Sequence, residues 1–596
     1  MKTFWKIFFG SLLGCLVAML ICLFIMIGMA GSAASSAMKG SAAPKAGSVL
    51  RIDRNALICE RAVEDLSMAA FTKRSTGSKV ALLDAVRAID AAATDPAIKM
   101  IYLSTEGLEM SISNAEEVRA ALSRFRASGK PVVAYGENFT MLSYYLASVA
   151  DKVIMNTNGE TLMMGVATQG IFLKDLLDKL GVDVQLIRHG KYKSAGEMFI
   201  KNAMSDENRA QTQAMVDGIW GSMADEICAS RGFTREQLDG WINNLELSNA
   251  RTLLERNMVD TLCHIDEAKA YLCNLTEAPS MEKIKFVALG DYAGAKLAAP
   301  GKSKDKVAVL YATGEIVTDG DTEQNIVGAK FAAEIEKVRQ DSSIKAVVFR
   351  VNSPGGSVQA SQFVRREIQL LQEVKPVIAS YGDYAASGGY WISASSDKIF
   401  CDNTTLTGSI GVFSLMPNIG GAAKKTLKVN IETVGSHEHS DMISGTRSLN
   451  GPELDYMQAS VEDIYEQFLT LVSEGREMSK EAVDEIAQGR VWCGCDAFGI
   501  GLADEKGGLV DAIAYAAAAA NLADYKIVEC PTPKTTMERF MEMFGGGASV
   551  KALFAGQEPK TVWEQTLSQI ESAYSFLNNA EEAVVYARMP YIYEIK

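Results

Sequence analysis

The chain has 596 residues, too many for one hydrophobic core, so two or three domains are expected. With 48% hydrophobic and 22% charged residues, its composition excludes wholesale disorder and a multi-span membrane protein. The formal net charge is -14 and the Lys and Arg residues are scattered, which excludes a broad nucleic-acid-binding face.

The first predicted element is a membrane-spanning helix. Residues 7–29 carry no charged side chain, and the stretch exceeds the roughly 20 helical residues that cross a bilayer core. A cleaved signal peptide usually has a shorter apolar stretch, although the small residues that follow would suit cleavage. Lys2 and Lys6 precede the span and Lys39 is the next cation, so the positive-inside bias places the N-terminus in the cytoplasm. We therefore expect residues 1–29 to be an inner-membrane anchor, with the bulk of the chain on the extracytoplasmic side.

After a linker at residues 30–47, the chain contains two copies of one unit. The repeat is visible in two pairs of segments: DPAIKMIYLSTEG (95–107) with DSSIKAVVFRVNS (341–353), and YGENFTMLSYYLASVADKVI (135–154) with YGDYAASGGYWISASSDKIF (381–400). We place the first repeat at residues 48–300 and the second at residues 301–530. A duplicated domain accounts for the length.

Within each copy, short apolar strands alternate with helical stretches, as in VAVLYATGEI, KFAAEIEKVRQ, KAVVFRV and SQFVRREIQLLQEV. Repeated βα units predict an α/β fold with a mainly parallel sheet covered by helices. The turns after the strands should then carry the chemistry. Residues 531–596 contain the amphipathic stretch VWEQTLSQIESAYSFL and are expected to form a C-terminal helical extension.

Two turns of the second copy differ from the first. Asn352-Ser353-Pro354-Gly355-Gly356 follows the strand KAVVFRV, where paired glycines let backbone N–H groups converge on an oxyanion, or merely allow tight packing. Ala386-Ser387-Gly388-Gly389 lies between a strand and a helix start. Ser387 there is either an exposed nucleophile or a helix N-cap, and the aligned residues of the first copy are Met141, Leu142 and Ser143.

A serine hydroxyl needs a base, and the chain offers four histidines and one lysine loop. A catalytic triad with a histidine base remains an alternative, although each histidine is as easily a surface residue. The four are His189, His264, His437 and His439. The loop with His437 and His439 aligns roughly with the first copy's GKYKSAGE loop, which carries Lys193. Lysine and serine are thus complementary across the repeat.

Lysine acts as a base only when its pKa falls from about 10.4 by several units, through burial or positive neighbours. Lys191 and His189 lie beside Lys193, and Met198 and Phe199 follow, which makes such a shift plausible. From the residues alone, the simpler interpretation is a solvated lysine loop.

Cysteine usage predicts neither a disulfide framework nor a metal site. The ten cysteines show no repeated ligand spacing, and Cys493 and Cys495 in WCGC are the one close pair. No histidine lies near them in the sequence, so we interpret them as two small packed or exposed thiols.

Several motifs together resemble one family. YKSAGEMF around Lys193, NSPGGS from Asn352, YAASGGYW around Ser387, LTGSIGVF from Leu406, GRVWCGCDA from Gly489 and ARMPYIYEI near the end are similar to the signal peptide peptidase A family in its long, tandem-repeat form, protease IV. GEMF after the lysine motif and WCGC depart from the pattern expected of that family, which affects pocket shape and leaves the Ser and Lys motifs intact.

The resemblance implies a Ser/Lys dyad with Ser387 as nucleophile and Lys193 as general base. It further implies that Ser409 orients the lysine amine and that Gly356 and Gly388 supply oxyanion N–H groups. The implied fold is that of the caseinolytic-protease/crotonase superfamily, assembled as a homotetramer on the inner membrane. The implied substrates are hydrophobic signal peptides left after preprotein processing.

We therefore predict acyl transfer by a membrane-anchored serine endopeptidase that needs no metal or organic cofactor. The alternatives are a crotonase-like acyl-CoA enzyme, which shares the paired-glycine turns, and a non-catalytic membrane scaffold. The sequence leaves open whether Ser387 and Lys193 pair within one chain or between chains.

Overall fold

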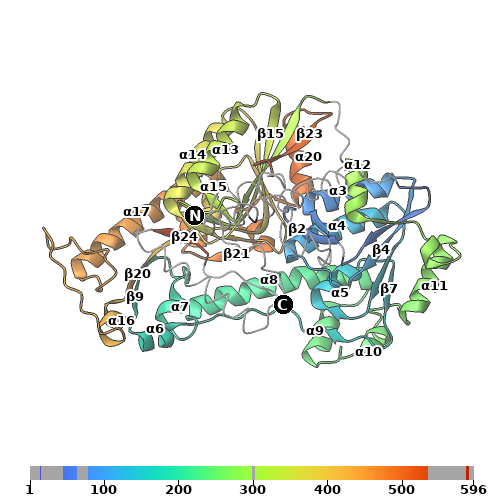
Figure 1. The fold of residues 1–596 in the computed structure, drawn as a ribbon, viewed down its shortest axis with the longest axis horizontal. Coiled ribbons are helices and arrows are strands. Elements are labelled where there is room, and N and C mark those ends of the chain that lie inside the picture. The colour runs from blue at the N-terminus through green and yellow to red at the C-terminus, as the bar shows by residue number, and fades with distance from the viewer. Residues whose placement is uncertain are drawn as a thin grey trace, which may run out of the picture.

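The computed structural model describes residue 14 and residues 44–54, 56–62, 78–297, 303–533 and 585–589. They form two α/β units, the first in the right half of Figure 1 and the second in its upper left part. Among these residues no helix is long and apolar enough to span a bilayer. The predicted anchor lies outside them except for residue 14, as do most of the linker and most of the C-terminal extension.

The first unit is built on a six-stranded parallel sheet with the order β10-β7-β5-β4-β1-β11. The strands are β1 (Ser48–Ile52), β4 (Ile98–Ser104), β5 (Val132–Gly136), β7 (Lys152–Met155), β10 (Thr261–Leu262) and β11 (Phe286–Ala288). Helices flank the sheet: α3 (Leu82–Thr94), α4 (Ile112–Ala127), α5 (Met141–Ala147), α11 (Ile265–Thr276) and α12 (Leu289–Leu297). Every residue of β5 is buried, as expected for a central strand of a parallel sheet covered on both faces.

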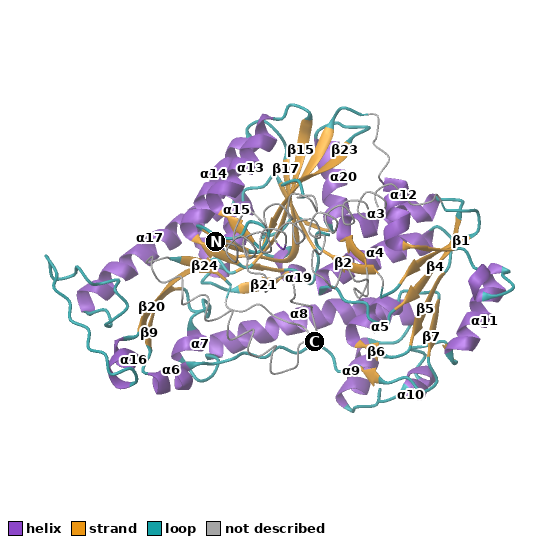
Figure 2. Ribbon diagram, viewed as in Figure 1, coloured by secondary structure: helices purple, strands orange, loops and turns teal. Residues whose placement is uncertain are grey.

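The second unit repeats this arrangement. Its strands β22 (Glu505–Lys506), β18 (Lys398–Cys401), β17 (Val377–Ala386), β15 (Ile344–Ser353), β12 (Lys306–Thr313) and β23 (Lys526–Cys530) follow the same parallel order as those of the first sheet. Two further strands, β19 (Leu406–Gly408) and β21 (Val491–Cys493), extend it beyond the end of β17. The predicted α/β fold with two repeats and mainly parallel sheets is therefore confirmed, and Figure 2 shows strands with helices beside them in each unit.

Side chains alternate across β12. Val307 and Val309 pack with helix α20 (Leu509–Ala519), whereas Ala308 and Leu310 face the core shared with α13 (Gly328–Gln340) and α14 (Val358–Gln372). Because successive strand residues point to opposite faces, a continuous apolar run is what a doubly covered strand requires.

A third sheet joins the units. Strand β9 (Asp183–His189), from the first half of the chain, pairs antiparallel with β20 (Val412–Asn418) of the second, from Val412 opposite His189 to Asn418 opposite Asp183. Helix α8 (Asp206–Arg231) then carries the chain back along the bottom of the molecule to the first unit (Figure 1). The loop between β9 and α8, which contains Lys193, is thereby fixed on the second unit.

Candidate active site

Ser387 occupies a strained turn between β17 and the short helix α15 (Gly388–Ser393). Its φ of 57° is unusual for a residue with a Cβ, and its backbone N–H donates to the Gly408 carbonyl at 2.7 Å. Ser387 stands at the N-cap position of α15, but its side chain makes no capping hydrogen bond. The fully buried hydroxyl faces Lys193 instead.

Lys193 is fully buried, and its Nζ lies 2.7 Å from the Ser387 Oγ. Burial lowers the pKa of Lys193 well below its usual value of 10.5, because a low-dielectric surrounding disfavours the ammonium. The Phe413 ring lies 6.0 Å from the amine. The solvated-loop interpretation is therefore wrong, and the two residues meet within one chain.

Ser409, which follows β19, completes a three-residue cluster. Its Oγ lies 3.0 Å and its carbonyl oxygen 3.1 Å from the Lys193 Nζ. Its φ is 50°, and its N–H donates to the Arg490 carbonyl at 2.7 Å. The amine thus has two fixed contacts with Ser409 besides its contact with Ser387, as expected if Ser409 orients it.

Two glycines to which no sequence pattern had given a role, Gly411 and Gly489, pack against the lysine. A Cβ on Gly489 would lie 2.5 Å from the Lys193 Cβ and 2.6 Å from its nitrogen. A Cβ on Gly411 would lie 3.3 Å from the Lys193 Cδ. The Tyr192 N–H donates to the Gln488 carbonyl at 2.9 Å. The motif GRVWCGCDA signalled this region, but only the fold shows that it packs against the lysine.

Behind the lysine, charged and amide side chains secure the loop. Arg188 donates to the Lys193 carbonyl at 2.7 Å and pairs with the buried carboxylate of Glu197 at 3.2 Å. From α8, Gln211 donates to the Tyr192 carbonyl at 2.9 Å and accepts from the Val491 N–H at 3.2 Å. These contacts tie the lysine loop to α8 and β21.

The two predicted oxyanion donors, Gly356 and Gly388, lie next to each other. Gly356 lies in β16 (Gly355–Ser357), and a Cβ on Gly388 would come within 3.0 Å of the Gly356 nitrogen. Gly355 has a φ of 99°, and a Cβ there would lie 2.6 Å from the Gly388 nitrogen, so no larger residue fits. The turn packs two backbone N–H groups beside Ser387.

A segment of the chain itself lies along this turn. Strand β24 (Tyr586–Arg588) pairs antiparallel with β16, with Gly356 opposite Ala587. Hydrogen bonds run from the Val358 N–H to the Val585 carbonyl and from the Met589 N–H to the Pro354 carbonyl. Because bonded pairs alternate along an antiparallel ladder, the Gly356 N–H faces the Ala587 carbonyl. The edge therefore accepts an extended peptide with a carbonyl at the predicted oxyanion donor.

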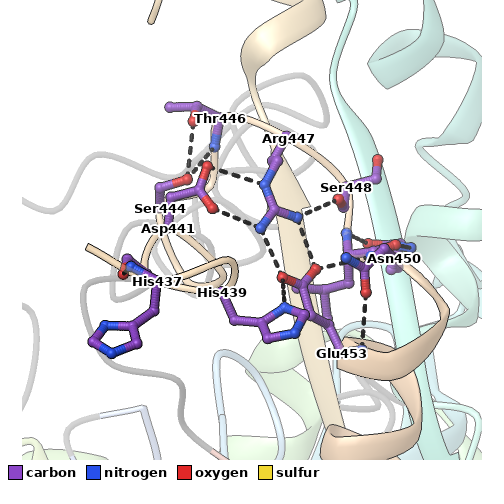
Figure 3. Close-up of polar contacts among 12 residues, drawn as sticks. His437, His439, Asp441, Ser444, Thr446, Arg447, Ser448, Asn450 and Glu453 are labelled. Carbon is purple, nitrogen blue, oxygen red and sulfur yellow. Dashed lines mark hydrogen bonds and ion pairs between the residues drawn. The ribbon is translucent and has the colours of Figure 1, made fainter. Parts of the chain in front are cut away.

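The histidines lie in other surroundings. His439 contacts Glu453, which Arg447 also binds together with Asp441, and His437 is exposed nearby (Figure 3). His189 stacks on Tyr465 with ring centroids 3.9 Å apart. Among the described residues, it is the Lys193 amine that hydrogen-bonds the Ser387 hydroxyl.

The chain matches the model of peptidase family S49 over residues 124–278 and 369–523, one match in each repeat. The chain belongs to peptidase family S49. Protease 4 of Haemophilus influenzae is 36% identical over 73% of this chain and 72% of its own. Protease 4 of Salmonella typhi is 35% identical over 79% of this chain and 77% of its own. The chloroplastic serine protease SPPA of Arabidopsis thaliana is 32% identical over 77% of this chain and 69% of its own.

Among solved structures, a mutant of ClpP1 from Listeria monocytogenes aligns with 34% of this chain and 94% of its own, with a TM-score of 0.23 and 15% identity. The assignment to S49 rests on the sequence matches. It makes this protein a serine peptidase, and it sets aside the acyl-CoA enzyme and the non-catalytic scaffold.

The pKa of Lys193 predicts how the rate of this S49 peptidase depends on pH. Since the pKa lies well below 10.5, the neutral, proton-accepting amine increases as pH rises through that lowered value, and it is lost below it. Activity should therefore rise with pH through that lowered value. Initial rates of peptide hydrolysis across the pH range in which the protein stays folded would measure this, and a rate that falls as the pH rises over that range would contradict a lysine base.

Proposed function

We propose that this S49 peptidase is a membrane-anchored endopeptidase that uses a Ser387 and Lys193 dyad to degrade cleaved signal peptides. The observation that carries the dyad is the 2.7 Å contact between the two side chains, both fully buried and contributed by different repeats. A buried amine beside a strained serine is the arrangement that base-activated acyl transfer requires.

In the proposed mechanism the neutral Lys193 accepts the Ser387 proton as the Oγ attacks the scissile carbonyl. The N–H groups of Gly356 and Gly388 stabilise the tetrahedral oxyanion. Lys193 then gives the proton to the leaving amine, and water hydrolyses the acyl-enzyme with the same lysine as base. Ser409 keeps the amine directed at the Oγ throughout.

The pairing of β24 with β16 supports an extended binding mode for the substrate. A peptide that binds antiparallel to β16 presents its carbonyl where the Ala587 carbonyl lies, next to Gly356 and Gly388. Ala587 is fully buried, so the residue at this position of a substrate should be small. Such a peptide takes the place of residues 585–589.

The remaining parts of the proposal have separate support. The uncharged stretch at residues 7–29 supports a single-pass anchor in the inner membrane, and Lys2 and Lys6 support a cytoplasmic N-terminus with the peptidase on the periplasmic side. The family resemblance supports signal peptides as substrates and a homotetramer as the assembly.

The full chain should stay with membranes after alkaline carbonate extraction, whereas a chain starting at residue 48 should become soluble. Both should cleave a hydrophobic signal peptide faster than a polar peptide of equal length, because the anchor determines only the location and both chains contain Ser387 and Lys193. Fractionation followed by cleavage assays on each fraction would measure both effects.

Release of the full chain by carbonate would contradict the anchor and leave the peptidase intact. Equal cleavage of the two peptides would contradict signal peptides as the preferred class. Including Ser387→Ala in each fraction controls for contaminating peptidases.

A further inference from the structure

Two thiols lie together at the junction of the two halves of the chain. Cys493 ends β21 and is buried, and Cys495 lies half-buried in the short helix α19 (Gly494–Ala497). Both sulfurs lie 3.1 Å from the point where a Cβ on Gly218 of α8 would stand. Each thiol is among the groups that shift the pKa of the other. They are therefore neighbours in space as well as in sequence.

The backbone permits a bond between them. Residues two apart have Cα atoms at most about 7 Å apart, and the turn into α19 shortens that separation into the range of a disulfide. Gly494 makes the tight turn possible, since a Cβ there would lie 2.0 Å from the Asp402 carbonyl. Both cysteines are free in this structure.

The two thiols differ in their access to solvent. Cys495 lines a surface pocket together with Gly218, Ser222, Glu226, Asn403 and Lys506, whereas Cys493 is 1% exposed and is not part of its wall. The Cys493 thiol donates to the Asn403 carbonyl at 2.9 Å. A reagent that enters the pocket thus meets Cys495 first.

The more exposed thiol, Cys495, is also the more acidic of the two. The neighbouring Cys493 side chain lowers the pKa of the Cys495 thiol, and the neighbouring Cys495 together with burial raises the pKa of Cys493 well above its usual value. The thiolate is the form that attacks disulfides.

We propose that Cys495 and Cys493 form a thiol–disulfide exchange pair, in which Cys495 attacks a small-molecule disulfide from the pocket and Cys493 resolves the product. The Cys495 sulfur breaks the S–S bond of the small disulfide, forms a mixed disulfide and releases one thiolate. Cys493 then attacks the Cys495 sulfur and releases the second thiolate. The two cysteine protons pass to the two leaving thiolates, so one small disulfide is reduced to two thiols as the pair is oxidised.

The pair is connected to the candidate active site through β19 and β21. Cys493 pairs with Leu406 of β19, and the same ladder ends at Gly408, whose carbonyl accepts the Ser387 N–H. Oxidation removes the hydrogen bond from Cys493 to Asn403, just before β19. This part of the inference rests on the proposed function: the disulfide should lower kcat/KM about fivefold, the effect of losing one buried hydrogen bond next to the Ser387 and Ser409 turns.

The test uses the full chain treated with oxidised glutathione, followed by peptide mapping by mass spectrometry. In the unchanged chain, the segment with both cysteines should lose two hydrogens, reversibly with dithiothreitol. Cys493→Ser should instead stop at a glutathione adduct on Cys495, because the resolving thiol is gone. Cys495→Ser should carry no adduct at position 493. Cys273→Ser, which removes another partly buried thiol, is the matched control and should behave like the unchanged chain.

An adduct on Cys493 in Cys495→Ser, or no change in this segment of the unchanged chain, would overturn the exchange pair. Peptide hydrolysis is measured before oxidation, so absent activity at that stage would speak against the proposed function and leave the thiol chemistry standing. A disulfide that forms without changing kcat/KM would overturn the connection to the active site.

Discussion

Replacing Ser387 by alanine, or Lys193 by alanine, should each lower kcat by at least about 10⁴-fold, as for members of other nucleophile and base pairs that act as a unit. Without the Oγ no acyl-enzyme forms, and without the amine the buried hydroxyl keeps its proton. Lys193→Arg should be equally inactive, because a guanidinium stays charged and cannot accept the proton. Hydrolysis of a hydrophobic signal peptide measures all three variants.

A fluorophosphonate probe gives a second readout. It should label Ser387 in the unchanged chain, lose the label in Ser387→Ala and label Lys193→Ala far more slowly. His439→Ala is the matched control, since that side chain contacts Glu453 and should leave both readouts unchanged. Activity that survives Lys193→Ala but not Ser387→Ala would make a histidine the base, and activity in both would place the peptidase site elsewhere.

Gly489→Ala should lower kcat/KM by about 10²-fold while the protein stays folded, since a displacement of about 1 Å in a catalytic group can cost that much. Gly489 has a φ of 77°, and a Cβ would come within 2.7 Å of three Lys193 atoms. The lysine backbone must then move, which takes the amine away from Ser387. Gly489 is a positioning residue, so the loss should appear in kcat more than in KM.

Gly501→Ala provides the control for backbone strain. Gly501 has nearly the same φ, 78°, but its nearest neighbour to a new Cβ is the Met478 sulfur at 3.6 Å. Both variants should lose thermal stability from the left-handed backbone, Gly489→Ala more because of its clash with Lys193, and only Gly489→Ala should lose activity. If the two variants lost activity equally, the contact with Lys193 would not matter.

The pattern of apolar and polar residues was sufficient to predict the α/β architecture and its duplication. The apolar runs alternating with amphipathic stretches predicted parallel sheets covered by helices, and the matching segments around residues 95–107 and 341–353 predicted the duplication. Both depend on short-range periodicity and on comparison of the chain with itself, which need no knowledge of packing. The third sheet was not predicted, because β9 and β20 pair across the repeat and neither carries a local sign of its partner.

The candidate active site also has residues that the sequence indicated and residues that only the structure revealed. The Ser387 turn stood out because glycines follow a strand end, yet an N-cap was an equal alternative until its backbone φ of 57° and its lack of a capping bond were known. Lys193 was chosen through the family resemblance, since its sequence neighbours alone favoured a solvated loop. The glycines around it and the contact between the Cys493 and Cys495 thiols became visible only in three dimensions.

The sequence by itself determined the number of repeats, the type of sheet and which turns hold glycine, serine and lysine, because these follow from residue type and spacing. Only the tertiary structure decided that Lys193 is buried 2.7 Å from Ser387, two side chains 194 positions apart. The reason is physical: a lysine pKa depends on desolvation, and desolvation here comes from β20, Gly411 and Gly489, which reach the lysine only when the second repeat packs against the loop of the first.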